Sequence, residues 1–169
     1  MLKIKPETIF ITGCAASGKK SLARKIKERY PDYQIYLTDD KSEEDLIHDI
    51  REKPGPKIIV GALYDSSFMG IKNPWFDAFK KLLKLNMIGH VIIIKPASVQ
   101  EIIKSIITRF YELLGTCEET PDSITNLIMK YVSHYEEYVN FYGRLTNVIR
   151  DKTYEFEPYD HLMFKYDFA

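Results

Sequence analysis

The feature that most constrains the fold is a short apolar segment that ends in a glycine-bounded loop and leads directly into a helix. Residues Thr8–Thr12 are rich in β-branched and apolar side chains on both faces, as in a strand buried at the centre of a parallel sheet. Gly13 and Gly18 bound the loop that follows. The segment Lys19–Tyr30 has its apolar residues at helical spacing, and Pro31 stops it. The sequence therefore predicts a buried strand, a tight loop and an amphipathic helix in succession.

The loop, Gly13-x-x-x-x-Gly18-Lys19, has the pattern of a phosphate-binding loop. Its glycines allow the backbone to turn tightly and to point N–H groups inward at phosphate oxygens. The following helix adds its positive N-terminal end, and Lys19 adds a mobile cation for the outer phosphates. A glycine turn with a purely structural role is the alternative. The residues expected to contact phosphate are Gly13, Ala15, Ala16, Ser17, Gly18, Lys19, Lys20 and Ser21.

Strands and helices alternate along most of the chain. After the first helix, the pattern predicts a strand at Gln34–Leu37, a helix from Ser42 to about Lys53, a strand at Lys57–Leu63, a helix opening at Asn73-Pro74, a strand at His90–Ile94 and a fifth strand at Tyr159–Tyr166. Such alternation with short connections is typical of a parallel sheet with right-handed crossovers and helices on both faces. The predicted fold class is therefore α/β, with three layers and about five parallel strands.

The later part of the chain is predicted to be mostly helical. Ser98 and Glu101 form a capping box, and the helix behind it ends at a loop near 115–121 that we interpret as a short lid. A further helix starts at Pro121 and keeps an apolar stripe through Ile149, with tyrosines at helical spacing. We interpret this stripe as core packing rather than as a cofactor site.

Three polar segments follow predicted strands, namely Thr12–Gly18, Thr38–Asp40 and Ala62–Ser67. In open parallel sheets, ligands bind at the carboxyl ends of the strands. We therefore expect these three segments to converge on one edge of the sheet and to form the site together.

The loop resembles that of the P-loop kinases, most closely the branch of nucleoside and nucleotide kinases related to adenylate kinase. In that branch the loop ends Gly-Lys-Gly-Thr, and Gly18-Lys19-Lys20-Ser21 is similar to it. Gly13, Gly18, Lys19 and Ser21 match the family's motif, whereas Lys20 departs from it. The resemblance implies a P-loop NTPase fold, ATP and Mg²⁺ as cofactors, and a metal contact from the Ser21 hydroxyl.

The resemblance also implies roles for three acids. In several P-loop kinases an aspartate after the second strand accepts a proton or orients the acceptor, and Asp39 and Asp40 hold that position. In adenylate-kinase-like enzymes an Asp-Gly pair after the third strand orders magnesium, but Val60-Gly61 stands there in this chain. Asp65 is then the shifted candidate for the metal. The alternative for all three acids is a solvated loop.

Arg109 lies on the helix before the expected lid. Kinases of the resembling branch have lid arginines that neutralise the transferring phosphate, which makes Arg109 the matching candidate here. The lid itself contains Glu118 and Glu119 and is poor in arginine. The four histidines show no metal-binding spacing, and we interpret them as structural or surface residues.

Composition fits a single globular domain over residues 1–169, with 45% hydrophobic residues for its core, and the resemblance implies that this domain is P-loop kinase-like. A formal net charge of zero gives no bulk attraction to nucleic acid or to a membrane surface, and no apolar run is long enough to span a bilayer. Cys14 and Cys117 match no metal or redox spacing, so we expect free thiols and a reducing, cytoplasmic location.

The sequence thus predicts an ATP-dependent phosphotransferase whose acceptor is a nucleotide, a nucleoside or a similar small molecule. In this hypothesis Lys19, Asp39, Asp40 and Arg109 serve transfer, and Ser21 and Asp65 place Mg²⁺. A kinase of nucleic-acid 5′ ends is a second hypothesis, which the zero net charge does not favour. A nucleotide-binding or interaction domain with impaired catalysis is a third, favoured by Lys20, by the missing aspartate after the third strand and by the arginine-poor lid.

Overall fold

Eleven helices and strands make up the described part of the chain. The computed structural model describes residues 8–13, 17–63, 74–85, 87–95, 98–112, 121–148 and 153–156. In order, the elements are β1 (Thr8–Gly13), α1 (Lys19–Arg29), β2 (Gln34–Leu37), α2 (Glu43–Glu52), β3 (Lys57–Val60), α3 (Pro74–Lys84), β4 (His90–Ile94), α4 (Val99–Glu112), α5 (Pro121–Ser133), α6 (Tyr135–Val148) and β5 (Thr153–Phe156). No helix among these residues is long and apolar enough to cross a membrane.

The five strands form one sheet in the order β2-β3-β1-β4-β5, and every neighbouring pair is parallel. This confirms the prediction of an α/β fold around a parallel sheet of about five strands. Two strand positions differ from the prediction. The fifth strand is Thr153–Phe156, whereas the predicted segment 159–166 lies outside the described residues. The third strand ends at Val60 rather than Leu63, because the chain leaves the ladder after Gly61 donates its N–H to the Ile11 carbonyl.

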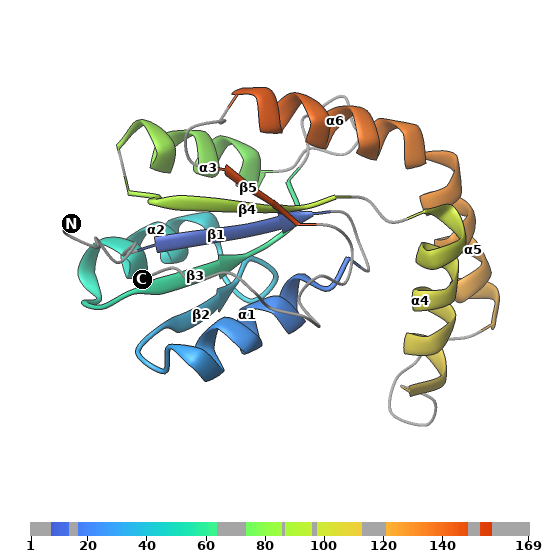
Figure 1. The fold of residues 1–169 in the computed structure, drawn as a ribbon, viewed down its shortest axis with the longest axis horizontal. Coiled ribbons are helices and arrows are strands. Elements are labelled where there is room, and N and C mark those ends of the chain that lie inside the picture. Colours follow the sequence, from blue (N-terminus) through green and yellow to red (C-terminus); the bar gives the residue numbers. More distant parts are fainter. Residues whose placement is uncertain are drawn as a thin grey trace.

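Helices cover both faces of the sheet (Figure 1). On one face, Leu22, Ala23 and Ile26 of α1 pack against Ile9 and Ile11 of β1 and their neighbours. On the other face, α2, α3 and α6 contribute to a larger core around Phe10 and Phe79, whose rings meet edge to face at 5.0 Å. Because β1 is buried on both sides, it is the central strand that its apolar sequence predicts.

The prediction of one helix from Pro121 through Ile149 is wrong. The structure has two helices, α5 and α6, which meet at His134 and run in different directions (Figure 1). Ser133 donates its hydroxyl hydrogen to the Met129 carbonyl at 2.7 Å, a back-bond that competes with the helical ladder and bends helices. The bend lets α6 lie along the sheet, where its part of the apolar stripe is buried as predicted; the buried residues are Tyr138, Phe141, Tyr142 and Leu145.

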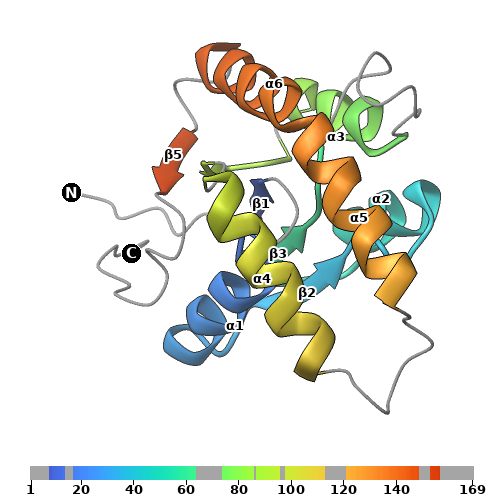
Figure 2. The same ribbon diagram turned by 90° about the vertical axis from the view of Figure 1, so that its right-hand side faces the viewer.

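The helices α4 and α5 pack on each other and stand beyond the carboxyl ends of β1 and β4 (Figures 1 and 2). The predicted capping box at the start of α4 is present. The Ser98 hydroxyl accepts from the Glu101 N–H, and the Glu101 carboxylate accepts from the Ser98 N–H, both at 3.3 Å. The box fixes where the chain turns from the end of the sheet into this helix pair.

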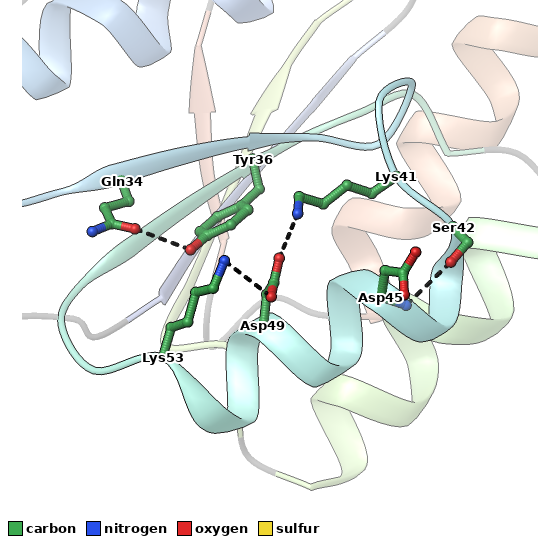
Figure 3. A network of polar contacts seen from close by, with 7 residues as sticks. All are labelled: Gln34, Tyr36, Lys41, Ser42, Asp45, Asp49 and Lys53. Atoms are coloured by element: carbon green, nitrogen blue, oxygen red, sulfur yellow. Dashed lines mark hydrogen bonds and ion pairs between the residues drawn. The ribbon is translucent and has the colours of Figure 1, made fainter.

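A buried aspartate ties α2 to the strand β2 and the turn after it (Figure 3). Asp49 accepts from the Lys41 ammonium at 2.5 Å and pairs with Lys53 at 3.2 Å. Both ammonium groups lie within 6.0 Å of the Tyr36 ring centre, and the Tyr36 hydroxyl donates to Gln34. The hydrogen bond from Lys41 is the main cause that lowers the pKa of Asp49 below its ordinary 3.8, and the same bond raises the pKa of Lys41.

We expect Asp49→Asn to destabilise the protein at neutral pH and to have little effect in acid. Because the folded pKa of Asp49 is lowered, its charged form stabilises the fold above the ordinary pKa, and this contribution is lost as the pH falls through the folded pKa. Thermal unfolding of both proteins between about pH 2 and pH 7 measures the difference, which should shrink toward the acid end.

The matched control is Asp77→Asn. Asp77 forms a pair with Lys80 at 3.2 Å, but both side chains are more than half exposed, so its loss should lower the melting temperature less than the loss of the Asp49 charge. A difference between wild type and Asp49→Asn that stays constant down to about pH 2 would contradict the assigned role of the Asp49 charge.

Candidate phosphate-binding site

The start of α1 lies where the direction of the chain connections reverses. After β1 the chain passes through α1 to β2, at one end of the strand order. After β4 it passes through α4, α5 and α6 to β5, at the opposite end of the strand order. The carboxyl end of β1, between β3 and β4, is therefore at the switch point, where ligands bind in open α/β sheets. Figure 1 shows α1 beginning at this end of the sheet.

Gly13, the last residue of β1, is a glycine for a steric reason. A Cβ atom at this position would lie 2.8 Å from the Ser17 hydroxyl oxygen and 2.9 Å from the carbonyl oxygen of Ile94, its partner on β4. Both distances are shorter than side-chain carbon atoms tolerate. The missing side chain therefore lets the chain fold back over the end of β1.

The start of α1 lacks the features that usually stabilise the N-terminus of a helix. Gly18 has φ 89° and ψ 20°, a left-handed conformation that favours glycine, and its carbonyl accepts the Leu22 N–H at 3.0 Å. In the described structure no side chain caps the helix, and its first turn carries Lys19 and Lys20 but no acid. Cations repel the positive end of a helix dipole. A bound anion at these N–H groups would reverse that repulsion.

Lys19 and Ser17 face the turn itself. The half-buried Lys19 side chain reaches back across the loop and donates to the Gly13 carbonyl at 3.1 Å. Ser17 is 1% exposed, and its hydroxyl has no hydrogen-bond partner among the described residues. An unpaired buried hydroxyl costs about 1–3 kcal/mol. Phosphate oxygens are acceptors for both groups, so the residues present fit a bound phosphate chain.

A tyrosine from α6 joins β1 to the segment that follows β3. The Tyr142 hydroxyl lies 3.4 Å from the Thr12 hydroxyl and accepts the Leu63 N–H at 3.4 Å, and all three groups are buried. Thr12 directly precedes the loop, and Leu63 follows β3. Tyr142 therefore links the end of β1 to the segment after β3 from a distant part of the sequence.

A threonine after β2 packs directly on the glycine after β3. Thr38 donates its N–H to the Val60 carbonyl at 3.0 Å, and its side chain fills the space where Gly61 would carry a Cβ. Such a Cβ would lie within 2.9 Å of three Thr38 side-chain atoms. The ends of β1, β2 and β3 are therefore held together, and the predicted convergence of their following segments is confirmed for the described residues.

Asp39 and Asp40, the two acids after β2, differ in the contacts that they make. Asp39 forms an ion pair with Lys20, with 3.8 Å between the ammonium nitrogen and the carboxylate oxygen, and the two side chains are 77% and 48% exposed. Asp40 is exposed in the same turn, where its N–H donates to the Leu37 carbonyl at 3.1 Å. The structure thus brings Lys20 and Asp39 together, and Ser21 is exposed beside them on α1.

Several predicted site residues cannot be placed. Ala15, Ala16 and Asp65 lie outside the described residues, as does the lid segment except for its last residue, Pro121. Arg109 is on α4, beyond the carboxyl ends of the strands, but its side chain is outside the described part. No group of three or more histidines, cysteines or acids that could hold a metal occurs among the described residues.

Sequence reasoning placed Thr12 and Thr38 in segments at the ligand edge without assigning them contacts, and it missed Tyr142. The position of the two threonines at strand ends was a usable signal, because polar residues there face the ligand edge. Tyr142 gave no such signal, since helical spacing identifies the buried face of α6 but not where a hydroxyl group reaches.

Comparisons with known proteins leave the family open. No protein-family model matches the chain, and no curated protein matches it. Among solved structures, the crystal structure of APE1195 is similar, with 17% sequence identity and a TM-score of 0.42 over 66% of this chain and 72% of that one. A likeness of this degree carries no argument about function.

We expect Gly61→Ala to destabilise the protein by about 1–3 kcal/mol, because the added methyl group overpacks against Thr38. In a Thr38→Ala background two of the three clashing atoms are absent. Gly61→Ala should therefore lower the free energy of unfolding by clearly less in that background than in the wild type. Urea unfolding of the four proteins of this double-mutant cycle measures both costs.

Gly143→Ala is the control for the effect of removing a glycine. Gly143 is exposed on α6 with open space around its Cβ position, so alanine there should stabilise by about 0.5–1 kcal/mol. If Gly61→Ala costs the same with and without the Thr38 side chain, the proposed contact is not what requires the glycine.

Proposed function

We propose that this chain binds ATP through the loop between β1 and α1 and transfers the terminal phosphoryl group to a small acceptor, a nucleotide, a nucleoside or a similar molecule. The observation that carries the proposal is the uncapped, lysine-bearing start of α1 at the switch point of the sheet. Helix N-termini in this setting bind phosphate through their N–H groups and dipole. The resemblance of the loop to that of the P-loop kinases supports ATP as the ligand.

The roles of individual residues follow from the chemistry of a triphosphate. The N–H groups at the start of α1 and the buried Ser17 hydroxyl would bind phosphate oxygens, and Lys19 would leave the Gly13 carbonyl to neutralise the outer phosphates. ATP supplies the phosphoryl group. Asp40 would orient the acceptor hydroxyl, and Arg109 is the candidate for stabilising the transferred charge.

A second candidate is a nucleotide-binding domain that does not transfer phosphate. The pairing of Asp39 with Lys20 favours it, because one of the two acids suited to orient an acceptor already faces a cation. Screening nucleotides and nucleosides for ADP release separates the two candidates. Saturable release with one class of acceptor supports transfer, whereas ATP binding without release across the set supports the second candidate.

Lys19→Ala should weaken ATP binding about 10- to 100-fold, since a hydrogen bond to a charged group contributes about 1.5–3 kcal/mol. Isothermal titration calorimetry with ATP measures the loss. Lys27→Ala is the matched control, because Lys27 is an exposed lysine on the same helix, two turns further on. Its affinity for ATP should equal that of the wild type.

Circular dichroism and thermal unfolding establish that both variants are folded. A folded Lys19→Ala protein that binds ATP as tightly as the wild type would overturn the assignment of the phosphate loop, whatever the result of the acceptor screen.

A further inference from the structure

Lys20 stands where the common form of the phosphate loop carries its metal-binding hydroxyl, whereas in the adenylate-kinase-like form that hydroxyl comes one residue later, where this chain has Ser21. In the common motif the residue after the loop lysine is Ser or Thr, and its oxygen is a ligand of Mg²⁺. An ammonium group has three donors and no lone pair, so it cannot ligate a metal ion. Lys20 therefore cannot supply the metal ligand of the common motif, and the next hydroxyl along the chain is that of Ser21, which is exposed on α1.

In the described structure, the acid closest to Lys20 is Asp39, and the two side chains form an ion pair. Asp39 follows β2 at the ligand edge of the sheet, and its carboxylate lies 3.8 Å from the Lys20 nitrogen. A divalent cation at this place would have to displace or repel Lys20.

The Lys20–Asp39 pair is easily opened. Both side chains are well exposed, at 48% and 77%, and exposed ion pairs of this kind are weak. Lysine carries a compact charge on a flexible stem. Lys20 can therefore turn from Asp39 to a phosphate oxygen while its backbone stays in the first turn of α1.

We propose that this site binds the triphosphate without a divalent metal, and that Lys20 supplies the positive charge that Mg²⁺ supplies in other phosphate loops. The inference rests on the proposed binding of ATP but not on phosphoryl transfer. Lys19 and Lys20 together give two positive charges beside the N-terminal end of α1. Mg²⁺ in solution removes part of the negative charge of free ATP and competes with these lysines for the same oxygens, so it should weaken binding.

Titration calorimetry with ATP, once in excess EDTA and once in excess MgCl₂, tests the proposal on the wild-type chain. We expect ATP to bind at least about tenfold more tightly in EDTA. Lys20→Ser restores the usual hydroxyl at this position and should reverse the preference, so that the magnesium complex binds more tightly than free ATP.

Two further variants separate the charge of Lys20 from general effects. Asp39→Asn removes the competing partner of Lys20 and should strengthen binding in EDTA by about 1.5- to 5-fold. Lys27→Ala removes one exposed positive charge from the same helix and should leave the ratio of the two affinities unchanged. Lys20, Asp39 and Lys27 are exposed, and thermal unfolding checks that each variant remains folded.

The possible outcomes distinguish this inference from the proposed function. If the wild type binds ATP more tightly with magnesium than without, the inference is wrong, and phosphate binding by the loop stands. The inference is also wrong if Lys20→Ser keeps the wild-type preference for free ATP. If the wild type binds ATP in neither buffer, the proposed function itself fails.

Discussion

The candidate site depends on the close approach between the end of β1 and its neighbours. Gly13 lies against the Ile94 carbonyl and the Ser17 hydroxyl with no room for a side chain. The chain can therefore turn back over the strand and begin α1 at the edge of the sheet. Hydrogen bonds of Tyr142 to Thr12 and Leu63 hold the neighbouring backbone in place. The two ends of the loop are thus held by packed strands and a helix, the kind of support that binding sites with a fixed geometry generally have.

The sequence predicted the elements of the fold because their signals are local. Apolar strands, capping residues and prolines act within a few positions, and β1, α1, β2, α2 and β4 begin and end within about two residues of prediction. The break at His134 was missed because apolar spacing continues across it. The Ser133 hydroxyl bonds back to the Met129 carbonyl beside the break. Thr108 makes the same kind of bond inside the unbroken helix α4, so this bond alone does not cause the break.

The position of the site could be predicted from the sequence, but the contacts between its side chains could not. The strand–loop–helix order places Lys19 at the carboxyl edge, since ligands of open parallel sheets bind there. The pairing of Lys20 with Asp39 depends on how the start of α1 sits against the turn after β2, which is a property of the packed fold. The same holds for Thr38 and Gly61, whose contact joins residues on two different strand ends.

The arrangement of charge at the start of α1 is unfavourable for the helix itself. This is the observation behind the proposed binding of an anion. Natural helices usually carry acids or a capping side chain in the first turn, whereas α1 carries two lysines and a left-handed glycine. A stretch that violates local preferences within an otherwise consistent fold is commonly functional. Asp39 relieves only part of the repulsion, because it pairs with Lys20 across exposed solvent. A triphosphate brings enough negative charge to satisfy both lysines and the helix end. A divalent cation on the same oxygens would offset part of that negative charge.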